Sequence, residues 1–307
     1  GVYDIANELL QDRGLTEVIS IIADVTHKDR LEKVFKEHQP DFVFHAAAYK
    51  HVPLMENNPF EAVECNVHGT INLADLSAQY LVEKFVMIST DKAVNPTNIM
   101  GATKRISEMY VQALNNHLET LGGKTHFITT RFGNVLGSNG SVIPLFKKQI
   151  EKGGPVLVTH PDITRYFMTI PEACQLVLEA GVMGSGGEIF IFDMGKSIKI
   201  IDLAKKMIQL SGLQLDKDIE IKFTGLRNGE KLYEELLNDQ EYTKPTHHEK
   251  IMIAKVREVE FNGIKADVLE LFKLIQEDDD IKLVTKMKKI VPEFISNASK
   301  YESLDAK

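Results

Sequence analysis

The sequence predicts an α/β fold: a doubly wound parallel sheet with a smaller α/β lobe attached to it. Two observations predict this class. Short β-branched runs alternate with amphipathic stretches of helix length, and the chain between successive runs is long enough for a crossover helix. Crossovers of this kind bring the carboxyl ends of parallel strands to one edge of the sheet, so we expect binding residues at that edge.

The elements can be assigned in order along the chain. Residues 1–14 have the pattern of an amphipathic helix. We predict strands at residues 18–23, 42–46, 85–89 and 126–132, and helices at residues 29–37, 59–77 and 101–118. After Gly137 the alternation is less regular, and the charged stretch from Asp278 predicts a solvated terminal helix. We divide the chain into residues 1–140, an interleaved lobe of residues 141–255, and a helical extension of residues 256–307.

One segment typical of a dinucleotide-binding sheet is not found in the sequence. Such a sheet opens with a strand, a GxGxxG-type turn and a helix whose N-terminus receives the pyrophosphate. The 307 residues contain no turn of this kind at the start of the first domain. We therefore expect the chain to be part of a longer polypeptide.

Composition excludes several other classes of function. The chain has 36 basic and 44 acidic residues, a formal charge of -8, which argues against nucleic acid as a partner. It contains no apolar run of membrane-spanning length and no export signal. Cys65 and Cys174 have no CxxC or Cys/His companion, so we expect free thiols in the cytoplasm. The run His247-His248-Glu249 lacks further ligands at useful spacing, and we predict no metal site.

Five ordered motifs carry the functional signal, and two of them hold the candidate chemistry. Ser89-Thr90-Asp91-Lys92 ends a predicted strand, and Met100 lies four residues before Lys104 at the head of a predicted helix. The motifs are HAAAYKHVPLMENNPFEAVECNVHGT (45–70), STDKAVNPTNIMGATKR (89–105), TRFGNVLGSNGSVIPLF (130–146), TRYFMTIPEA (164–173) and GLRNGEKLYEELL (225–237). Over about residues 1–255 the chain resembles the polysaccharide-biosynthesis branch of the nucleotide-sugar 4,6-dehydratases, which are extended short-chain dehydrogenases/reductases.

The resemblance implies a Rossmann-like NAD-binding domain in residues 1–140 and a nucleotide-sugar-binding lobe in residues 141–255. It also implies a hydro-lyase that acts on a UDP-N-acetylhexosamine. In the family reaction the C4 hydroxyl is oxidised, water is lost across C5–C6, and the hydride returns to C6. NAD is then recycled within each turnover and the product is a 4-keto-6-deoxy sugar.

Catalytic roles follow from the same resemblance. Asp91 is expected to protonate the departing O6 hydroxyl and Lys92 to remove the C5 proton, with a pKa depressed by burial and by Lys104. Thr90 is expected to hydrogen-bond O4. Lys104 would hold the nicotinamide ribose, and Met100 would fill the volume of the tyrosine found in relatives. The acceptor of the O4 proton stays open; our hypothesis is a relay through Thr90 to Asp91 or to water.

Binding residues are assigned in the same way. For the cofactor they are Asp24 and Val25 beside the adenine and Ala46, Ala47 and Ala48 at a strand end, with Tyr49, Lys50 and Asn66 nearby. For the nucleotide-sugar they are Asn134, Arg165 and Arg227 at the pyrophosphate and Glu230 at a ribose hydroxyl. Simpler interpretations are helix–sheet packing for the alanines, a surface salt bridge for Arg165 and a helix-start pair for Glu230 and Lys231. His45 and His51 are left unassigned.

Two other functions share most of these features. A nucleotide-sugar 4-epimerase shares the first oxidation but needs no C5 base and no O6 acid, so Asp91 and Lys92 favour dehydration. The other is a non-catalytic nucleotide-sugar-binding module, suggested by the missing glycine-rich turn. By analogy with the fold we expect a homo-oligomer with an interface on helices 59–77 and 101–118.

Overall fold

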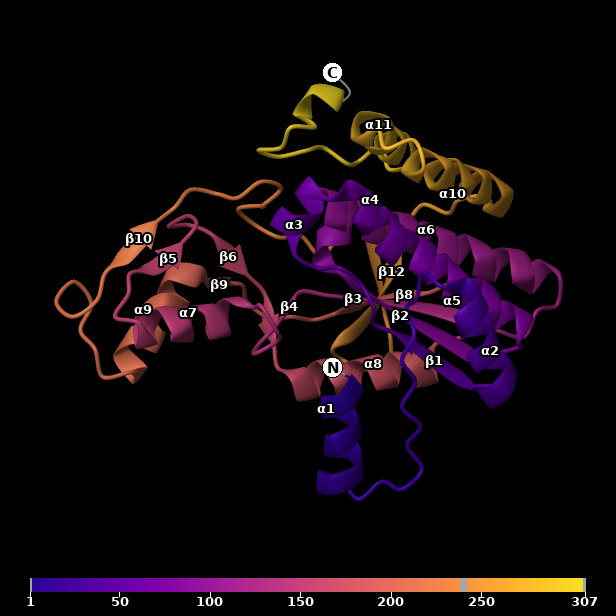
Figure 1. Ribbon diagram of the computed structural model, residues 1–307, viewed down its shortest axis with the longest axis horizontal. Helices are drawn as coiled ribbons and strands as arrows, with labels where there is room; N and C mark the ends of the chain where they lie inside the picture. The colour runs from indigo at the N-terminus through magenta and orange to yellow at the C-terminus, as the bar shows by residue number, and fades with distance from the viewer. Residues whose placement is uncertain (1, 238–241, 306–307) are drawn as a thin grey trace.

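The computed structural model describes residues 2–237 and 242–305 (Figure 1). Its centre is a six-stranded sheet in the order β1-β2-β3-β8-β12-β11. The first four strands run parallel to one another. Next to them, β12 pairs antiparallel with β8, and β11 pairs antiparallel with β12. The strands are β1 (Phe42–His45), β2 (Lys84–Thr90), β3 (His126–Phe132), β8 (Ile189–Phe192), β12 (Ile251–Lys255) and β11 (Tyr242–Pro245).

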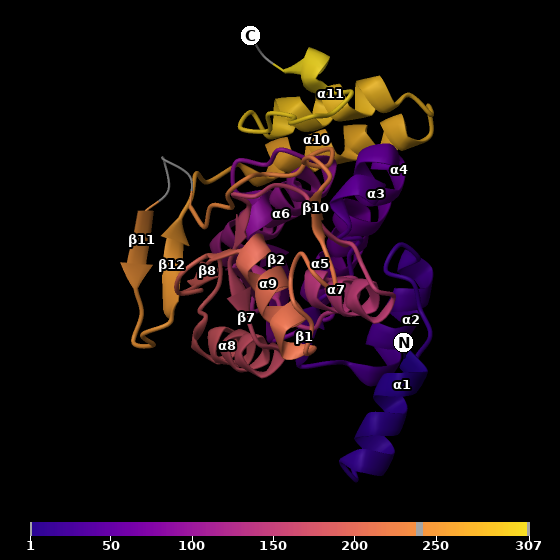
Figure 2. The same ribbon diagram turned by 90° about the vertical axis from the view of Figure 1, so that its left-hand side faces the viewer.

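Helices cover both faces of this sheet, as Figure 2 shows for α6 and α8. Alternate residues of the central strands point to opposite faces: Phe85 and Met87 pack in the cluster under α6, whereas Val86 packs in the cluster with α8. This two-sided cover confirms the predicted doubly wound α/β class. The covering elements are α2 (Lys28–His38), α3 (Val52–Asn57), α4 (Pro59–Ala62), the π-helical turn η2 (Val63–His68), α5 (Gly69–Gln79), α6 (Ile99–Thr120) and α8 (Ile170–Met183).

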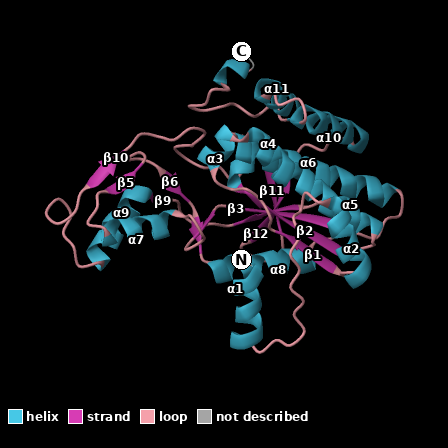
Figure 3. Cartoon of the chain, viewed as in Figure 1, coloured by secondary structure: helices cyan, strands magenta, loops and turns pink. Residues whose placement is uncertain are grey.

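A smaller lobe lies beside the carboxyl ends of the central strands, at the left of Figure 3. Its own core includes Phe146, Val156 and Ile208. The predicted boundaries at residues 140 and 255 stay a proposal, since β8, β11 and β12 come from the second range and belong to the central sheet. The lobe comprises α7 (Val142–Glu151), β5 (Val156–Val158), α9 (Ile200–Leu210) and β10 (Ile221–Phe223). Two short strand pairs lie between the lobe and the sheet: β4 (Asn134–Val135) with β7 (Phe167–Met168), and β6 (Thr164–Arg165) with β9 (Ile198–Lys199).

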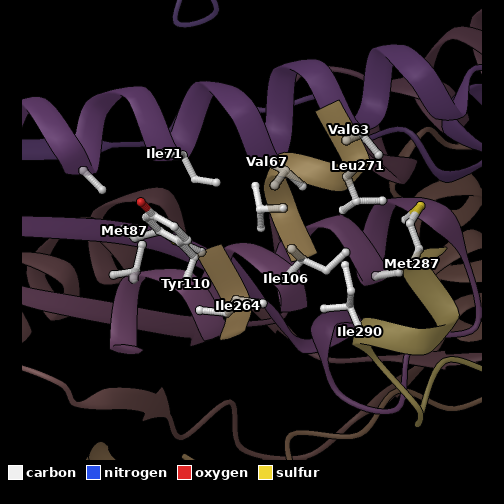
Figure 4. Close-up of a cluster of buried hydrophobic side chains, with 14 of the residues drawn as sticks. Val63, Val67, Ile71, Met87, Ile106, Tyr110, Ile264, Leu271, Met287 and Ile290 are labelled. Atoms are coloured by element: carbon white, nitrogen blue, oxygen red, sulfur yellow. The ribbon is translucent and has the colours of Figure 1, made fainter. Parts of the chain in front are cut away.

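The C-terminal helices α10 (Phe261–Ile275) and α11 (Asp280–Ile290) pack on the outer side of α6, η2 and α4 (Figure 4). Leu271 and Met287 are fully buried there against Val67 and Ile106. The prediction of a solvated terminal helix was therefore wrong. Because α10 and α11 of the same chain cover α6, residues 101–118 are not free to form the expected oligomer interface, whereas a homo-oligomer and an interface on residues 59–77 stay predictions. The short η4 (Glu302–Leu304) follows.

Residues 18–23 do not form the predicted strand. Ile19 and Ile22 are 70% and 86% exposed, and in the described ranges β1 pairs with β2 alone. An extended segment becomes a strand only when a neighbouring strand accepts and donates its backbone hydrogen bonds. β-branched side chains favour the extended backbone but do not supply that neighbouring strand. The N-terminal helical segments α1 (Val2–Asn7) and η1 (Glu8–Asp12) bury none of their residues. No helix in the described part of the chain is both long and apolar enough to cross a bilayer.

A buried ion-pair network joins α6 to the two central strands. The Arg131 guanidinium donates to Glu108 through Nε at 2.8 Å and through Nη2 at 2.6 Å, and both side chains are fully buried. Ser89 Oγ also donates to Glu108, at 2.6 Å, and Arg105 lies 3.3 Å away. Burial would raise the pKa of Glu108, but the two guanidinium groups outweigh it and hold the pKa below its ordinary value.

We expect Glu108→Ala to lower the free energy of unfolding by about 3–5 kcal/mol, because it leaves the buried Arg131 charge without its carboxylate. Urea titration measures this change. As a control, Lys282→Ala removes an exposed pair with Glu277 and should leave the free energy of unfolding nearly unchanged. A loss no larger than that control would contradict a structural role for the Glu108 network.

Candidate active site

A cavity of about 680 Å³ lies between the carboxyl ends of the parallel strands and the smaller lobe. Its wall includes Thr90 after β2, Lys104 on α6, Asn134 after β3, and Arg165 and Glu230 from the lobe. The fold thus brings most of the predicted residues to the edge expected from the strand order. Asp24, Val25, Ala47 and Asp91 do not belong to this wall.

Close packing at Gly101 holds the strand-end loop in place. After β2 the chain makes the 3-10 turn η3 (Asp91–Ala93) and then enters α6, where the Asn98 side chain accepts a hydrogen bond from Gly101 N at 2.8 Å. A Cβ at Gly101 would lie 2.1 Å from the carbonyl oxygen of Lys92. Only glycine therefore lets the head of α6 approach this loop so closely.

Lys92 is the centre of a polar cluster. Its Nζ lies 2.9 Å from Asp91 Oδ1, 3.2 Å from Asn134 Oδ1 and 3.3 Å from Glu234 Oε1. Burial would lower the pKa of Lys92, but the Asp91 and Glu234 carboxylates outweigh it and raise the pKa above its ordinary value. The expected depression of the Lys92 pKa was wrong, because no local pattern showed that a second carboxylate, that of Glu234, approaches this amine.

Asp91 lies behind Lys92 and Thr90 and does not face the cavity. It is fully buried, and its Oδ1 also accepts from Thr90 Oγ1 at 2.9 Å. In the described part of the chain Oδ2 has no hydrogen-bond partner. Gly133 leaves room for it, since a Cβ there would lie 3.0 Å from Oδ2. Asp91 therefore reaches the cavity wall through its hydrogen bonds with Thr90 and Lys92, and its expected role as the acid for O6 stays a prediction.

Lys104 is a buried cation that reaches the cavity wall without a hydrogen-bond partner among the described residues. It is 5% exposed. Burial lowers its pKa to about 8, although Glu108 and the Cys65 thiol partly oppose the shift. Met100, four residues earlier, is 4% exposed and packs in the core beside the cavity. An ammonium in such a place can donate to a ligand hydroxyl without first breaking another bond.

The strand end after β1 is open. Ala46 and Ala47 are exposed, so helix–sheet packing does not explain these two small residues. Asn66 fixes the next turn, because its side chain accepts from Tyr49 N at 2.7 Å and donates to Tyr49 O at 3.0 Å. Lys50 lines the cavity nearby, and its Nζ lies 3.4 Å from Ser138 Oγ.

Asp24 and Val25 lie in the irregular segment before α2, which contacts the start of α5. The Asp24 carboxylate accepts from Thr26 N at 2.9 Å and from Thr26 Oγ1 at 2.8 Å. Val25 packs closely on Gly69, where a Cβ would lie 2.5 Å from Val25 Cγ2, and Asn72 donates to Val25 O at 3.1 Å. Their predicted contact with an adenine stays a prediction.

The two unassigned histidines have ordinary roles in packing. His45 is buried, its Nε2 lies 2.8 Å from Thr70 Oγ1, and burial followed by the Lys104 charge lowers its pKa to about 3. It is therefore neutral at physiological pH. His51 lines the cavity and packs on Gly140, where a Cβ would lie 2.4 Å from the His51 ring.

Acidic and basic side chains alternate from the Lys92 cluster into the lobe. Beyond Lys92, Glu234 Oε1 lies 3.6 Å from Arg165 Nε, and Arg165 Nη2 lies 3.4 Å from Glu230 Oε1. Arg227 Nη2 is also 3.4 Å from Glu230 Oε1. Arg165 is only 6% exposed, so it is not a surface salt-bridge partner. Glu230 lies in a loop, so it does not start a helix.

Glu234 is the site residue that sequence reasoning missed. It is 7% exposed, contacts both Lys92 and Arg165, and has one carboxylate oxygen without a partner in the described structure. Its signal was present in the segment GEKLYEELL, where it lies four residues after Glu230. Periodicity could not select it, because residues 225–237 form no regular helix or strand.

The doubly wound sheet, with a cavity at the carboxyl ends of its parallel strands, defines a Rossmann-like α/β protein. A family model described as "Polysaccharide biosynthesis protein" matches residues 1–256, and the chain belongs to that family. The X-ray structure of Pen from Bacillus thuringiensis superposes with a TM-score of 0.73 and 32% identity, over 87% of this chain and 86% of that one.

Curated relatives carry more specific names. The capsular polysaccharide biosynthesis protein CapD of Staphylococcus aureus is 58% identical over 83% of this chain and 42% of its own length. A UDP-N-acetylglucosamine 4,6-dehydratase (inverting) of Campylobacter jejuni is 41% identical over 72% of this chain and 62% of its own. A UDP-glucose 4-epimerase of Rickettsia massiliae is 39% identical over 73% and 63%. The chain thus spans less than two thirds of the length of each of these three proteins.

We expect Lys104→Met to stabilise the protein at pH 7, because it removes a buried, unpaired charge. Lys104 has a pKa of about 8 in the folded protein against an ordinary value of 10.5. Between these values the unfolded chain binds more protons than the folded one, so the stability of the parent protein rises with pH. The advantage of the variant should be full at pH 7 and shrink from pH 8 to pH 10.

Urea unfolding of both proteins at pH 7, 8.5 and 10 measures this difference. Lys300→Met changes an exposed lysine and serves as the control. A stability difference that is the same at all three pH values would show that Lys104 titrates normally.

Proposed function

We propose that the protein is an NAD-dependent hydro-lyase that converts a UDP-N-acetylhexosamine to its 4-keto-6-deoxy derivative in polysaccharide biosynthesis. The observation that carries the proposal is the amine of Lys92 on the cavity wall, with Asp91 and Thr90 in one hydrogen-bonded group beside it. A carboxylate and an amine at this place supply the acid and base that loss of water across C5–C6 requires. The names of the Campylobacter and Staphylococcus relatives support the same reaction.

The residues of this chain fit the cofactor that the reaction needs. Lys104 presents an ammonium without a hydrogen-bond partner in the described structure, suited to the hydroxyls of a nicotinamide ribose. Ala46 and Ala48 leave the strand end open where a dinucleotide would pass. When bound, NAD would accept a hydride from C4 and return it to C6.

Thr90 and Asp91 would move the proton of O4. The Thr90 hydroxyl lines the cavity and already donates to Asp91 Oδ1. As the sugar O4–H gives its proton to Thr90 Oγ, the threonine proton passes to Asp91. Asp91 would later return a proton to Thr90 as the threonine hydroxyl donates its own proton to O6, and the C6–O6 bond then breaks with loss of water. One proton is taken up and released, so Asp91 ends as it began.

Lys92 would act as the base at C5. Its neutral amine takes the C5 proton, the C5–C6 double bond forms as the C6–O6 bond breaks, and the lysine later returns a proton to C5. This step needs Lys92 without its proton, whereas Asp91 and Glu234 raise its pKa. Activity should therefore increase with pH as Lys92 is deprotonated.

Arg165 and Arg227 would bind the diphosphate, with Asn134 beside it and Glu230 accepting from a ribose hydroxyl.

We also propose that the protein works in the cytoplasm. Cys65 and Cys174 are both free thiols, which fits a reducing compartment.

The rival enzyme is a nucleotide-sugar 4-epimerase, favoured by the Rickettsia relative. An epimerase would make no use of a base and acid beside C5 and C6. Thr90 and Lys104 would serve both reactions, so only Asp91 and Lys92 separate them.

Incubation with NAD and UDP-N-acetylglucosamine tests the proposal. The protein should carry whatever residues its gene encodes before Gly1, and the product is analysed by mass spectrometry and NMR. We expect loss of one water and a C4 ketone. Lys92→Met should lower kcat at least 100-fold, and Lys222→Met, at an exposed lysine outside the cavity wall, should keep kcat within fivefold. A C4 epimer of unchanged mass would establish the rival, and binding of UDP without turnover would indicate a binding module.

Glu234→Gln tests the control of Lys92. Without the second carboxylate the pKa of Lys92 falls, so the increase of kcat/KM with pH should shift to lower pH than in the parent protein. Glu235→Gln, at an exposed neighbour paired with Lys231, is the matched control and should leave the profile unmoved. An unchanged or alkaline-shifted profile for Glu234→Gln would exclude this role.

A further inference from the structure

Residues 295–299, which we name the C-terminal strap, lie outside the range matched by the family model and yet contact the candidate site. After α11 the chain turns back and runs over α3 at the top of the molecule, as the yellow trace in Figure 1 shows. Lys288 of α11 fixes its start by donating to Ser296 Oγ at 2.8 Å. The strap therefore connects the C-terminal helices to the cavity.

The strap binds the loop before α6. Ile295 N donates to Pro96 O at 3.1 Å, and Asn297 N donates to Thr97 O at 3.2 Å. Farther along, Ser299 Oγ donates to Glu56 Oε2 at 2.6 Å. The other oxygen of this buried carboxylate accepts from the N–H of Ile99, at the start of α6, at 2.7 Å. Two routes thus tie the strap to the helix that carries Lys104.

Asn297 also binds the loop that carries Glu230. Its carbonyl accepts from Gly229 N at 2.7 Å, and its side-chain Nδ2 donates to Glu230 O at 2.8 Å. Gly229 O in turn accepts from Thr97 Oγ1 and Asn98 Nδ2, both at 3.0 Å. Three segments distant in sequence therefore meet at one point.

This junction is closely packed. Gly229 has a φ of +75°, and a Cβ there would lie 2.6 Å from Asn98 Cβ. The loop itself has no regular secondary structure between β10 and residue 237. Its position thus depends on contacts with other segments, and the bond from Asn297 to Glu230 O is the side-chain contact that the strap supplies.

We propose that Asn297 is a positioning residue for nucleotide binding. By holding the backbone of Glu230, it keeps the Glu230 carboxylate between Arg165 and Arg227, ready for the ribose and diphosphate. The inference rests on the proposed function, in which these three side chains bind the UDP part of the substrate. A loop ordered before binding loses less conformational entropy on binding, so the strap raises affinity without touching the ligand.

Isothermal titration with UDP tests this inference on the whole chain. Asn297→Ala and the size-matched Asn297→Asp both remove the donor to Glu230 O and keep the backbone bonds of residue 297. We expect each to weaken UDP binding about tenfold, which corresponds to about 1.4 kcal/mol. KM for the nucleotide-sugar should rise by a similar factor while kcat stays within twofold, because Lys92 and Asp91 are untouched.

Lys300→Ala is the matched control, since it removes a bond to Asp280 beyond the strap. It should leave UDP affinity and KM unchanged. A Kd for UDP in both Asn297 variants equal to that of the parent protein would overturn the inference. So would a parallel fall of kcat and melting temperature, which would indicate general loosening of the fold. A parent protein that does not bind UDP would instead refute the proposed function, on which the inference rests.

Discussion

The buried pair between Glu108 and Arg131 is the contact on which the site geometry depends. It joins α6 to β3, and Ser89 brings the end of β2 to the same carboxylate. The next three residues after Ser89 are Thr90, Asp91 and Lys92. A charged pair without solvent stays intact only while its geometry is kept, so it fixes the relative position of helix and strand ends. Lys104, one turn before Glu108, is placed by the same helix.

The alternating charges across the cavity give Lys92 an environment that differs from the one expected for a base. Two carboxylates favour its charged form, and a proton must leave before the amine can act. Lys104 has the opposite environment, because burial dominates and no carboxylate pairs with it at hydrogen-bond distance among the described residues. Two lysines 12 positions apart in one cavity thus differ in pKa for reasons that are purely local.

Much of the architecture could be predicted from sequence. Strands 42–46, 85–89 and 126–132 are strongly apolar and β-branched or aromatic, and they form strands of the sheet where their pattern placed them. The last two are mostly buried, whereas Phe42 and Phe44 of the first are exposed. Residues 18–23 have the same local pattern and form no strand, because pairing depends on a neighbour. The burial of α11 was missed because its many lysines make the segment look polar. Four apolar residues, at positions 283, 284, 287 and 290, nevertheless lie on one side of the helix and are buried in the core.

The candidate site was predictable where a motif fixed both the residue and its place. Thr90, Lys92 and Lys104 lie on the cavity wall, and Arg165 and Arg227 flank Glu230. The orientation of Asp91 and the approach of Glu234 were not predictable, since both depend on contacts between segments far apart in the chain. The role proposed for Asn297 has the same origin: no local pattern marks a loop residue whose partners lie 68 and 67 positions away in the sequence.

Because α10 and α11 pack on α6, the end of the family model and the end of the apolar core fall at different residues. The match to the family model ends at residue 256, whereas the apolar interior continues through Leu271, Met287 and Ile290. A fragment trimmed to residues 1–256 would expose the apolar side of α6 that these helices cover, and we expect it to aggregate. The range that the family model matches is therefore shorter than the range that shares one apolar core.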